Sequence, residues 1–231
     1  MTTRRGGQGR PPYDSFNLGD HVGDDPATVR LHRERLAQAL GVTPVYLQQV
    51  HGSDVVHLND GWKDPPPVVA DAAVSTTPGL ACAILVADCL PVLLAHEGGR
   101  GVGAAHAGWR GLAGGVLENT VAALCRAVEC TGGDLVAWLG PCIGPRRFEV
   151  GEEVRQAFCR VQTGAAAHFR PGAQAGKWLA DLAGLACDRL AACGVTRIGT
   201  LGACTVEDSS HYFSFRRDGR TGRMAALVWI A

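Results

Sequence analysis

The fold of this chain is decided by residues 81–107, which read ACAILVADCLPVLLAHEGGRGVGAAHA. Within them, residues 81–87, 92–95 and 101–105 are short apolar runs bounded by Gly, Pro and Asp. Runs of this length are too short for typical helices and are typical of strands buried on both faces. The stretch therefore predicts consecutive buried strands.

Strands and helices alternate irregularly on both sides of this stretch. Residues 24–40 are predicted to form a helix, because Asp25 and Pro26 give a start signal and Gly41 a stop signal. We expect further helices over residues 112–128, 152–161 and 179–192, and a loop over 59–67. Further strands are expected over residues 45–50, 54–58, 74–77, 135–139, 197–201 and 224–230. The elements follow no strict β-α-β alternation and no linker divides them, so the pattern favours one mixed α/β (α+β) domain over residues 12–231. Residues 1–11 are basic and rich in Gly and Pro, and we expect them to form a flexible tail.

Composition narrows the class of function. The chain has 22 Lys plus Arg and 22 Asp plus Glu, so no overall field points to nucleic acid or a membrane surface, and a small ligand fits better. The N-terminus lacks the apolar stretch of a secretory signal, and no apolar run is long enough to span a membrane. The chain has nine cysteines, an odd number, and no pair of them has C-x-x-C spacing. The simplest explanation is a protein of the reducing cytoplasm in which most of these cysteines are small buried apolar residues.

Three residues suited to bind a metal stand where the chain turns out of apolar strands: His51, Cys89 and His106. Two imidazoles and one thiolate form a plausible zinc set, and three protein ligands leave a fourth position for water or substrate. Their spacing of 38 and 17 residues is not diagnostic. Residue chemistry alone leaves open a buried cysteine with satisfied histidines, or a cysteine hydrolase in which Cys89 is the nucleophile and His106 or His51 the base.

A glycine-rich turn follows His106 in the sequence HAGWRG, residues 106–111. Free backbone N–H groups at the start of a helix, together with Arg110, suit an anion such as phosphate. A plain strand-to-helix turn with a solvated Arg110 explains the same residues. Arg216 and Arg217, next to aromatic residues, are likewise either phosphate ligands or surface charges.

Several segments taken together resemble the YfiH-like family, also called laccase-domain or polyphenol-oxidase-like proteins. The segments are FNLG (16–19), QVHG (49–52), ADCLP (87–91), HAGWRG (106–111), GPCIG (140–144), FSFRR (213–217) and TGR (221–223). The resemblance implies a layered fold of paired mixed sheets flanked by helices. It also implies a metal site, zinc or alternatively copper, on His51, Cys89 and His106.

The resemblance implies a purine nucleoside enzyme that phosphorolyses adenosine, inosine or methylthioadenosine and deaminates adenosine. For deamination, zinc would lower the pKa of water, and Asp88 or a free histidine would protonate the leaving ammonia. For phosphorolysis, Arg110, His21 and Asn17 are the candidate phosphate or ribose contacts. The substrates would be a nucleoside and phosphate, and the oligomeric state is left open.

Two other activities are associated with this family. One is the editing of peptidoglycan precursors, which an amidase would perform with zinc or with a Cys–His pair. The other is copper-dependent oxidation of phenols. A multinuclear copper oxidase draws on repeated His-x-His pairs, which this chain with its eight histidines lacks, so copper at the His51, Cys89 and His106 site would explain such activity better.

Overall fold

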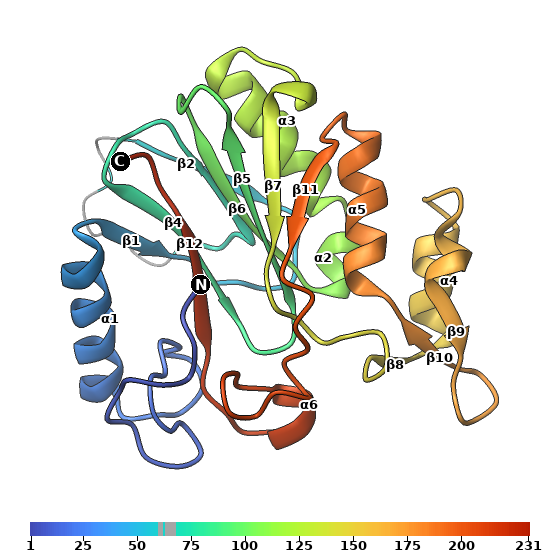
Figure 1. Cartoon of the computed structure of the whole chain (residues 1–231), viewed down its shortest axis with the longest axis horizontal. Helices are drawn as coiled ribbons and strands as arrows, with labels where there is room; N and C mark the ends of the chain where they lie inside the picture. The colour runs from blue at the N-terminus through green and yellow to red at the C-terminus, as the bar shows by residue number, and fades with distance from the viewer. Residues whose placement is uncertain (60–61, 63–67) are drawn as a thin grey trace.

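The computed structural model describes residues 1–59, 62 and 68–231, and most of the loop expected at 59–67 lies outside them. In this part of the chain, two sheets pack face to face and helices cover both outer faces (Figure 1). The prediction of a layered α/β fold with paired mixed sheets and flanking helices is confirmed.

The larger sheet has six strands in the order β11-β7-β5-β6-β3-β2. Their bounds are β2 (Val55–Leu58), β3 (Ala72–Ser75), β5 (Leu90–His96), β6 (Val102–Ala107), β7 (Leu135–Leu139) and β11 (Arg197–Thr200). The helices that cover its outer face are α2 (Trp109–Ala113), α3 (Val116–Val128) and α5 (Leu182–Ala192). Strand β5 runs antiparallel to both β6 and β7, at the centre of the sheet.

The smaller sheet has the order β1-β4-β12 and packs on the other face of the larger one. Its strands are β1 (Thr43–Tyr46), β4 (Leu80–Val86) and β12 (Met224–Val228), and helix α1 (Pro26–Leu40) covers its outer face. Ile84 and Val86 belong to the core between the sheets, whereas Ala83 and Leu85 belong to the core under α1. Strand β4 is thus buried on both faces, which explains its unbroken apolar sequence.

A third sheet lies to one side, beyond α5 (Figure 1). It contains β8 (Glu149–Gly151), β9 (Phe169–Pro171) and β10 (Lys177–Ala180), next to α4 (Glu152–Cys159). The remaining elements are the short helix α6 (Phe215–Asp218) and two 3₁₀ turns, Gly132–Asp134 and Ala165–His168.

The structure corrects two predicted helices. The helix expected over 112–128 is two helices, because Gly115 adopts φ +95°, a left-handed conformation that interrupts the helix between α2 and α3. The helix expected over 179–192 starts only at Leu182, after Asp181 caps it by accepting a hydrogen bond from the Gly184 N–H. The residues before Asp181 pair with β8 and β9 as strand β10 instead.

The N-terminal residues, expected as a flexible tail, make backbone hydrogen bonds to distant parts of the chain. The Thr2 N–H donates to the Ala225 carbonyl and the Arg4 N–H to the His211 carbonyl, both at 2.8 Å. These contacts attach residues 1–4 to the start of β12 and the loop before α6, whereas the expected domain start at residue 12 stays a prediction. No helix in the described residues is long and apolar enough to cross a membrane.

Candidate metal centre

The fold brings together the three residues that the sequence proposes as metal ligands. One ligand atom from each of His51, Cys89 and His106 lies within 4.8 Å of the others. The Cys89 Sγ and His51 Nε2 atoms are 3.6 Å apart, and the two imidazole centroids are 4.7 Å apart. With Zn–S of about 2.3 Å and Zn–N of about 2.0–2.1 Å, a tetrahedral ion separates its sulfur and nitrogen ligands by about 3.6 Å. The donor set suits a zinc ion, and the separation of the Cys89 and His51 donor atoms matches a tetrahedral site.

Each ligand comes from a different part of the chain, one from a strand and two from turns. His106 is in β6, on the same face as Val102 and Ala104, which face the smaller sheet. Cys89 lies in the turn between β4 and β5, and His51 in the turn after β1. Asp88 and His51 have positive φ values of 95° and 62°, which non-glycine residues adopt rarely. The backbone of both turns is thus held in an uncommon conformation beside the proposed ligands.

Two glycines of the HAGWRG turn allow this close approach. A Cβ at Gly108 would lie 2.8 Å from His51 Cδ2 and 3.1 Å from Cys89 Sγ. A Cβ at Gly111 would lie 2.6 Å from the Gly52 carbonyl oxygen. A side chain at either position would push the His51 turn away from His106.

Asp71 holds two of the three proposed ligands, and the sequence did not identify it. Its carboxylate, fully buried, accepts hydrogen bonds from the backbone N–H groups of Val50, His51 and Gly52 at 3.0, 2.9 and 2.7 Å. His106 Nδ1 also donates to it, at 2.8 Å, which leaves Nε2 free to bind an ion. The signal in the sequence was an acidic residue inside the apolar run VVADAAV (68–74), since a buried carboxylate needs partners.

The charges of this group are strongly coupled. Burial alone would raise the pKa of the Cys89 thiol, but the charge of His106 and hydrogen bonds with His106 and His51 lower it to about 6. Burial alone would lower the pKa of His106, but Cys89 and Asp71 raise it to about 9. Burial also opposes ionisation of Asp71, yet its bonds with His106, Gly52 and Val50 lower its pKa. The site stabilises a thiolate, the form that binds metals.

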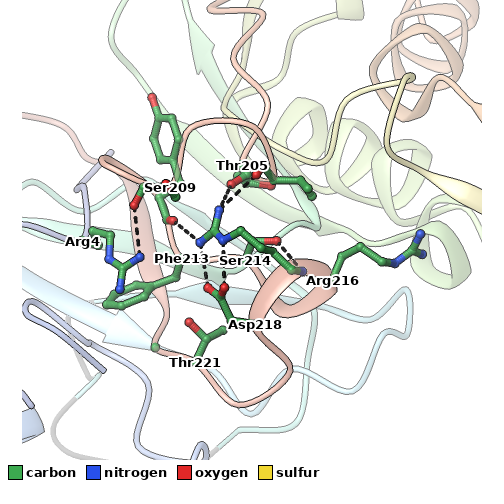
Figure 2. Close-up of polar contacts among 12 residues, drawn as sticks. Arg4, Thr205, Ser209, Phe213, Ser214, Arg216, Asp218 and Thr221 are labelled. Atoms are coloured by element: carbon green, nitrogen blue, oxygen red, sulfur yellow. Dashed lines mark hydrogen bonds and ion pairs between the residues drawn. The ribbon is translucent and has the colours of Figure 1, made fainter. Parts of the chain in front are cut away.

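Asp88, proposed as an acid, lies directly next to Cys89 but is engaged elsewhere. Its carboxylate accepts a hydrogen bond from the Thr205 hydroxyl and another from the Arg216 N–H, each at 2.6 Å. These bonds attach the Cys89 turn to helix α6, and Figure 2 shows Thr205 and Arg216 in this region.

The three predicted phosphate or ribose contacts, Asn17, His21 and Arg110, differ from one another in burial and in their partners. Asn17 is fully buried, and its side chain donates to the Gly19 carbonyl and Asp24 and accepts from the N–H groups of Gly19 and Arg223. All four of its hydrogen-bonding positions are thus used within the protein. His21 is largely exposed beside Asp20. Arg110 is exposed on α2, and its guanidinium lies 4.4 Å from the centroid of the Trp109 ring.

The arginines of the FSFRR segment bind the protein itself. The Arg217 guanidinium donates to the carbonyls of Thr205, Val206 and Tyr212 and pairs with Asp218. Figure 2 labels two of these partners, Thr205 and Asp218. The Arg216 guanidinium donates to the carbonyls of Arg147 and Glu149. These contacts favour a role in folding this loop over the phosphate-binding alternative.

Two hollows lie near the centre. A cavity of about 680 Å³ runs along β1 and includes Val50, the residue before His51, together with Tyr46, Trp62 and His21. A smaller hollow of about 320 Å³ is lined by His21, Phe215, Arg220, Thr221 and Arg223 among others. His21 is common to both.

Comparison with known proteins identifies the family of this chain. The whole chain, residues 1–231, matches the family described as multi-copper polyphenol oxidoreductase laccase. A Pseudomonas aeruginosa protein named purine nucleoside phosphorylase is 50% identical over 100% of this chain and 92% of its own length. The Escherichia coli purine nucleoside phosphorylase YfiH is also 50% identical, over 99% of this chain and 92% of its own.

Solved structures have the same fold. A Neisseria meningitidis protein of the DUF152 family is 46% identical and superposes with a TM-score of 0.93, covering 100% of this chain and 92% of its own. YlmD from Geobacillus stearothermophilus is 32% identical with a TM-score of 0.92, covering 99% of this chain and 90% of its own. The resemblance inferred from the motifs is confirmed, and the chain belongs to the YfiH-like family described as multi-copper polyphenol oxidoreductase laccase.

Proposed function

We propose that this protein is a zinc-dependent purine nucleoside phosphorylase that acts on adenosine, inosine or methylthioadenosine and also deaminates adenosine. The observation that carries the proposal is the three-ligand centre of His51, Cys89 and His106, together with a cavity of about 680 Å³ that is lined by Val50, the residue before His51. The names of relatives that are 50% identical over almost the whole chain support the choice of purine nucleosides.

His51, Cys89 and His106 would hold the ion, with Asp71 fixing two of them. A zinc ion there would act as a Lewis acid and make water more acidic. Two nitrogens and one thiolate also suit copper, which competes well for such donors. We favour zinc because the 3.6 Å between Cys89 Sγ and His51 Nε2 matches a tetrahedral site.

The cavity along β1 suits a nucleoside. Its volume of about 680 Å³ lies within the range typical of small-molecule sites. It offers the aromatic side chains of Trp62 and Tyr46, and the Tyr46 hydroxyl has no hydrogen-bond partner in the described residues. The Arg33 guanidinium already lies 4.0 Å from the centroid of the Tyr46 ring. A purine would therefore stack on Trp62, while a polar group of the nucleoside bonds the Tyr46 hydroxyl.

Phosphorolysis requires a bound phosphate and no covalent nucleophile from the protein. An oxygen of HPO₄²⁻ forms the bond to the ribose C1′ while the C1′–N9 bond breaks and its electron pair leaves with the purine. The proton that the phosphate loses balances the proton that the purine gains. The protein would hold both reactants in line. Arg110 and His21 remain our proposed phosphate or ribose contacts. Asn17, whose side chain accepts a hydrogen bond from the Arg223 N–H, would instead position Arg223.

Deamination is the second proposed reaction of this centre. Water would add at the purine C6, and the amino group would leave as ammonia after taking up a proton. Asp88 remains the proposed source of that proton, although its two hydrogen bonds give it a positioning role as well.

A cysteine hydrolase is a second candidate, and a specific contact favours it. Asp71, His106 and Cys89 are linked in the order of an acid–histidine–nucleophile set, with 2.8 Å between Asp71 and His106. Such an enzyme could cleave amide bonds of peptidoglycan precursors. It would need a free Cys89, whereas the nucleoside enzyme would carry a metal bound to it.

The cytoplasm is the proposed location. All nine cysteines are unpaired in the structure, including the exposed Cys159, as expected in a reducing compartment.

The test is product analysis with adenosine and with inosine, with and without phosphate. We expect free base only when phosphate is present, and inosine from adenosine without it. Arg110→Ala should raise the phosphate KM. If metal-free enzyme with an alkylatable Cys89 cleaved a peptidoglycan precursor and left nucleosides intact, the hydrolase would replace our proposal.

A further inference from the structure

Arg223 is an arginine near the centre that the predicted site did not include. It immediately precedes β12, whose first residue Met224 pairs with Val86 at the end of β4. The chain continues from Val86 to Cys89, so Arg223 lies alongside the turn that carries the proposed thiolate ligand. Burial lowers the pKa of Arg223, while the negative charges of Cys89 and Asp88 raise it, which places both groups within electrostatic range.

Two sequence motifs, FNLG (16–19) and TGR (221–223), hold Arg223 in place. Its backbone N–H donates to Asn17 Oδ1 at 2.8 Å, and its carbonyl accepts from the Leu18 N–H at 3.0 Å. A Cβ at Gly19 would lie 2.7 Å from the Arg223 Cγ, so the glycine leaves room for the arginine stem. The FNLG and TGR segments thus interlock around this one side chain.

Only one nitrogen of the Arg223 guanidinium donates hydrogen bonds to the described residues. Nη1 donates to the carbonyls of Thr221 and Gly222 at 3.0 and 3.1 Å. In the described residues Nε and Nη2 have no hydrogen-bond partner, and no carboxylate forms an ion pair with Arg223. A half-buried arginine without a carboxylate is suited to an anionic ligand.

The hollow of about 320 Å³ next to Arg223 offers more donors. Thr221 lines it and is 2% exposed, yet its hydroxyl has no hydrogen-bond partner among the described residues. His21 also lines it, as does Arg220, whose Nε and Nη2 donate to the Tyr13 hydroxyl and the Gly23 carbonyl and leave Nη1 for a ligand. No Asp or Glu of the described chain lines it. A buried hydroxyl without a partner is costly unless a ligand supplies one.

We propose that Arg223, Thr221 and Arg220 form the subsite that holds the phosphate co-substrate beside the His51, Cys89 and His106 centre. This inference rests on the proposed phosphorylase function and gives its second substrate a location. The planar guanidinium would bind two phosphate oxygens, and the Thr221 hydroxyl would donate to a third. His21, which lines both hollows, would lie between the phosphate and the nucleoside.

The experiment compares Arg223→Lys, Arg223→Ala and Thr221→Val with Arg110→Ala and with Arg35→Ala, an exposed arginine on α1. Phosphate KM and nucleoside KM are measured separately, and inorganic phosphate binding is measured by calorimetry. Metal content and Tm are recorded for each variant. We expect Arg223→Ala to raise the phosphate KM about 100-fold and Arg223→Lys about tenfold, with the nucleoside KM and metal content unchanged.

Thr221→Val keeps the shape of the residue, so it separates binding from folding. It should weaken phosphate binding several-fold without lowering the Tm, because the hydroxyl has no partner in the protein. An unchanged phosphate KM and unchanged phosphate binding in the Arg223 and Thr221 variants would overturn the inference, whatever the effect of Arg110→Ala. If the wild-type enzyme released no base with phosphate, the proposed function would fail, and the calorimetry would still decide whether this anion subsite exists.

Discussion

Asp71 is the residue on which the proposed centre depends most after the ligands themselves. Its carboxylate fixes the ring of His106 and the backbone around His51 with four hydrogen bonds. An amide in its place would present N–H groups to some of these N–H donors. The substitution would displace the ligands and make the His106 imidazole less basic.

Asp71→Asn is therefore expected to weaken metal binding by about 10–100-fold. It should also destabilise the fold by about 1–3 kcal/mol, because buried donors lose their acceptor. Competition with a metal chelator measures the affinity, and denaturant unfolding measures the stability. Asp188→Asn is the matched control, since Asp188 makes a similar 2.7 Å contact with His168 away from the centre. Equal metal affinity in both variants would refute the role of Asp71.

Cys89 gives a prediction of pH dependence. Because the folded pKa of this thiol is lowered to about 6, the thiolate of the metal-free protein forms as pH rises through about 6. Alkylation of Cys89 by iodoacetamide should follow the same profile, and added zinc should suppress it. Mass spectrometry locates the modified residue, with the exposed Cys159 as the internal reference. A midpoint near 8.5, the ordinary thiol value, would contradict the proposed charge coupling.

At the scale of elements, the turn between β6 and α2 determines how closely the ligands meet. Gly108→Ala would place a methyl group 2.8 Å from the His51 ring and 3.1 Å from the Cys89 sulfur. We expect at least tenfold weaker metal binding, roughly the loss seen when supports of metal ligands are removed. Gly199→Ala in β11 is the control, because its Cβ would meet no atom closer than 3.8 Å. Chelator competition that finds the two variants alike would show that the turn tolerates a side chain.

The elements also show what the sequence can and cannot predict. Strand β4 was predictable because both of its faces are buried, so its apolar run is unbroken. The break between α2 and α3 was not, because Leu112, Val116, Thr120 and Leu124 keep helical spacing across Gly115. The short strands β8 to β10 have too few residues for a periodic signal.

The candidate site was predictable only where chemistry and motif coincide. His51, Cys89 and His106 have metal-binding side chains at strand ends, so their grouping could be proposed. Asp71 and Arg223 contact residues far away in the chain. The apolar run around Asp71 indicates that its carboxylate needs partners but not which ones, and no local pattern indicates the contacts of Arg223. Asn17 was proposed as a ligand contact from its motif, but its partners are within the protein.

At the scale of the whole molecule, we expect the fold to persist without a metal, because its apolar cores do not depend on the centre. Separate apolar cores lie between the two sheets, under α1 and under the helices α3 and α5. Removal of the metal should therefore abolish activity, lower the Tm by only a few degrees and leave the circular dichroism spectrum nearly unchanged. Unfolding on chelation would instead indicate a zinc-stabilised binding module.

The most direct test of the central claim is metal content and phosphate-dependent release of free base, measured on the same preparation of wild type and His106→Ala. We predict about one zinc per chain in the wild type, as a single three-ligand site requires, and free base from adenosine or inosine only with phosphate. His106→Ala should lose both the metal and the turnover while staying folded. Turnover that persists in a metal-free His106→Ala variant would contradict the account.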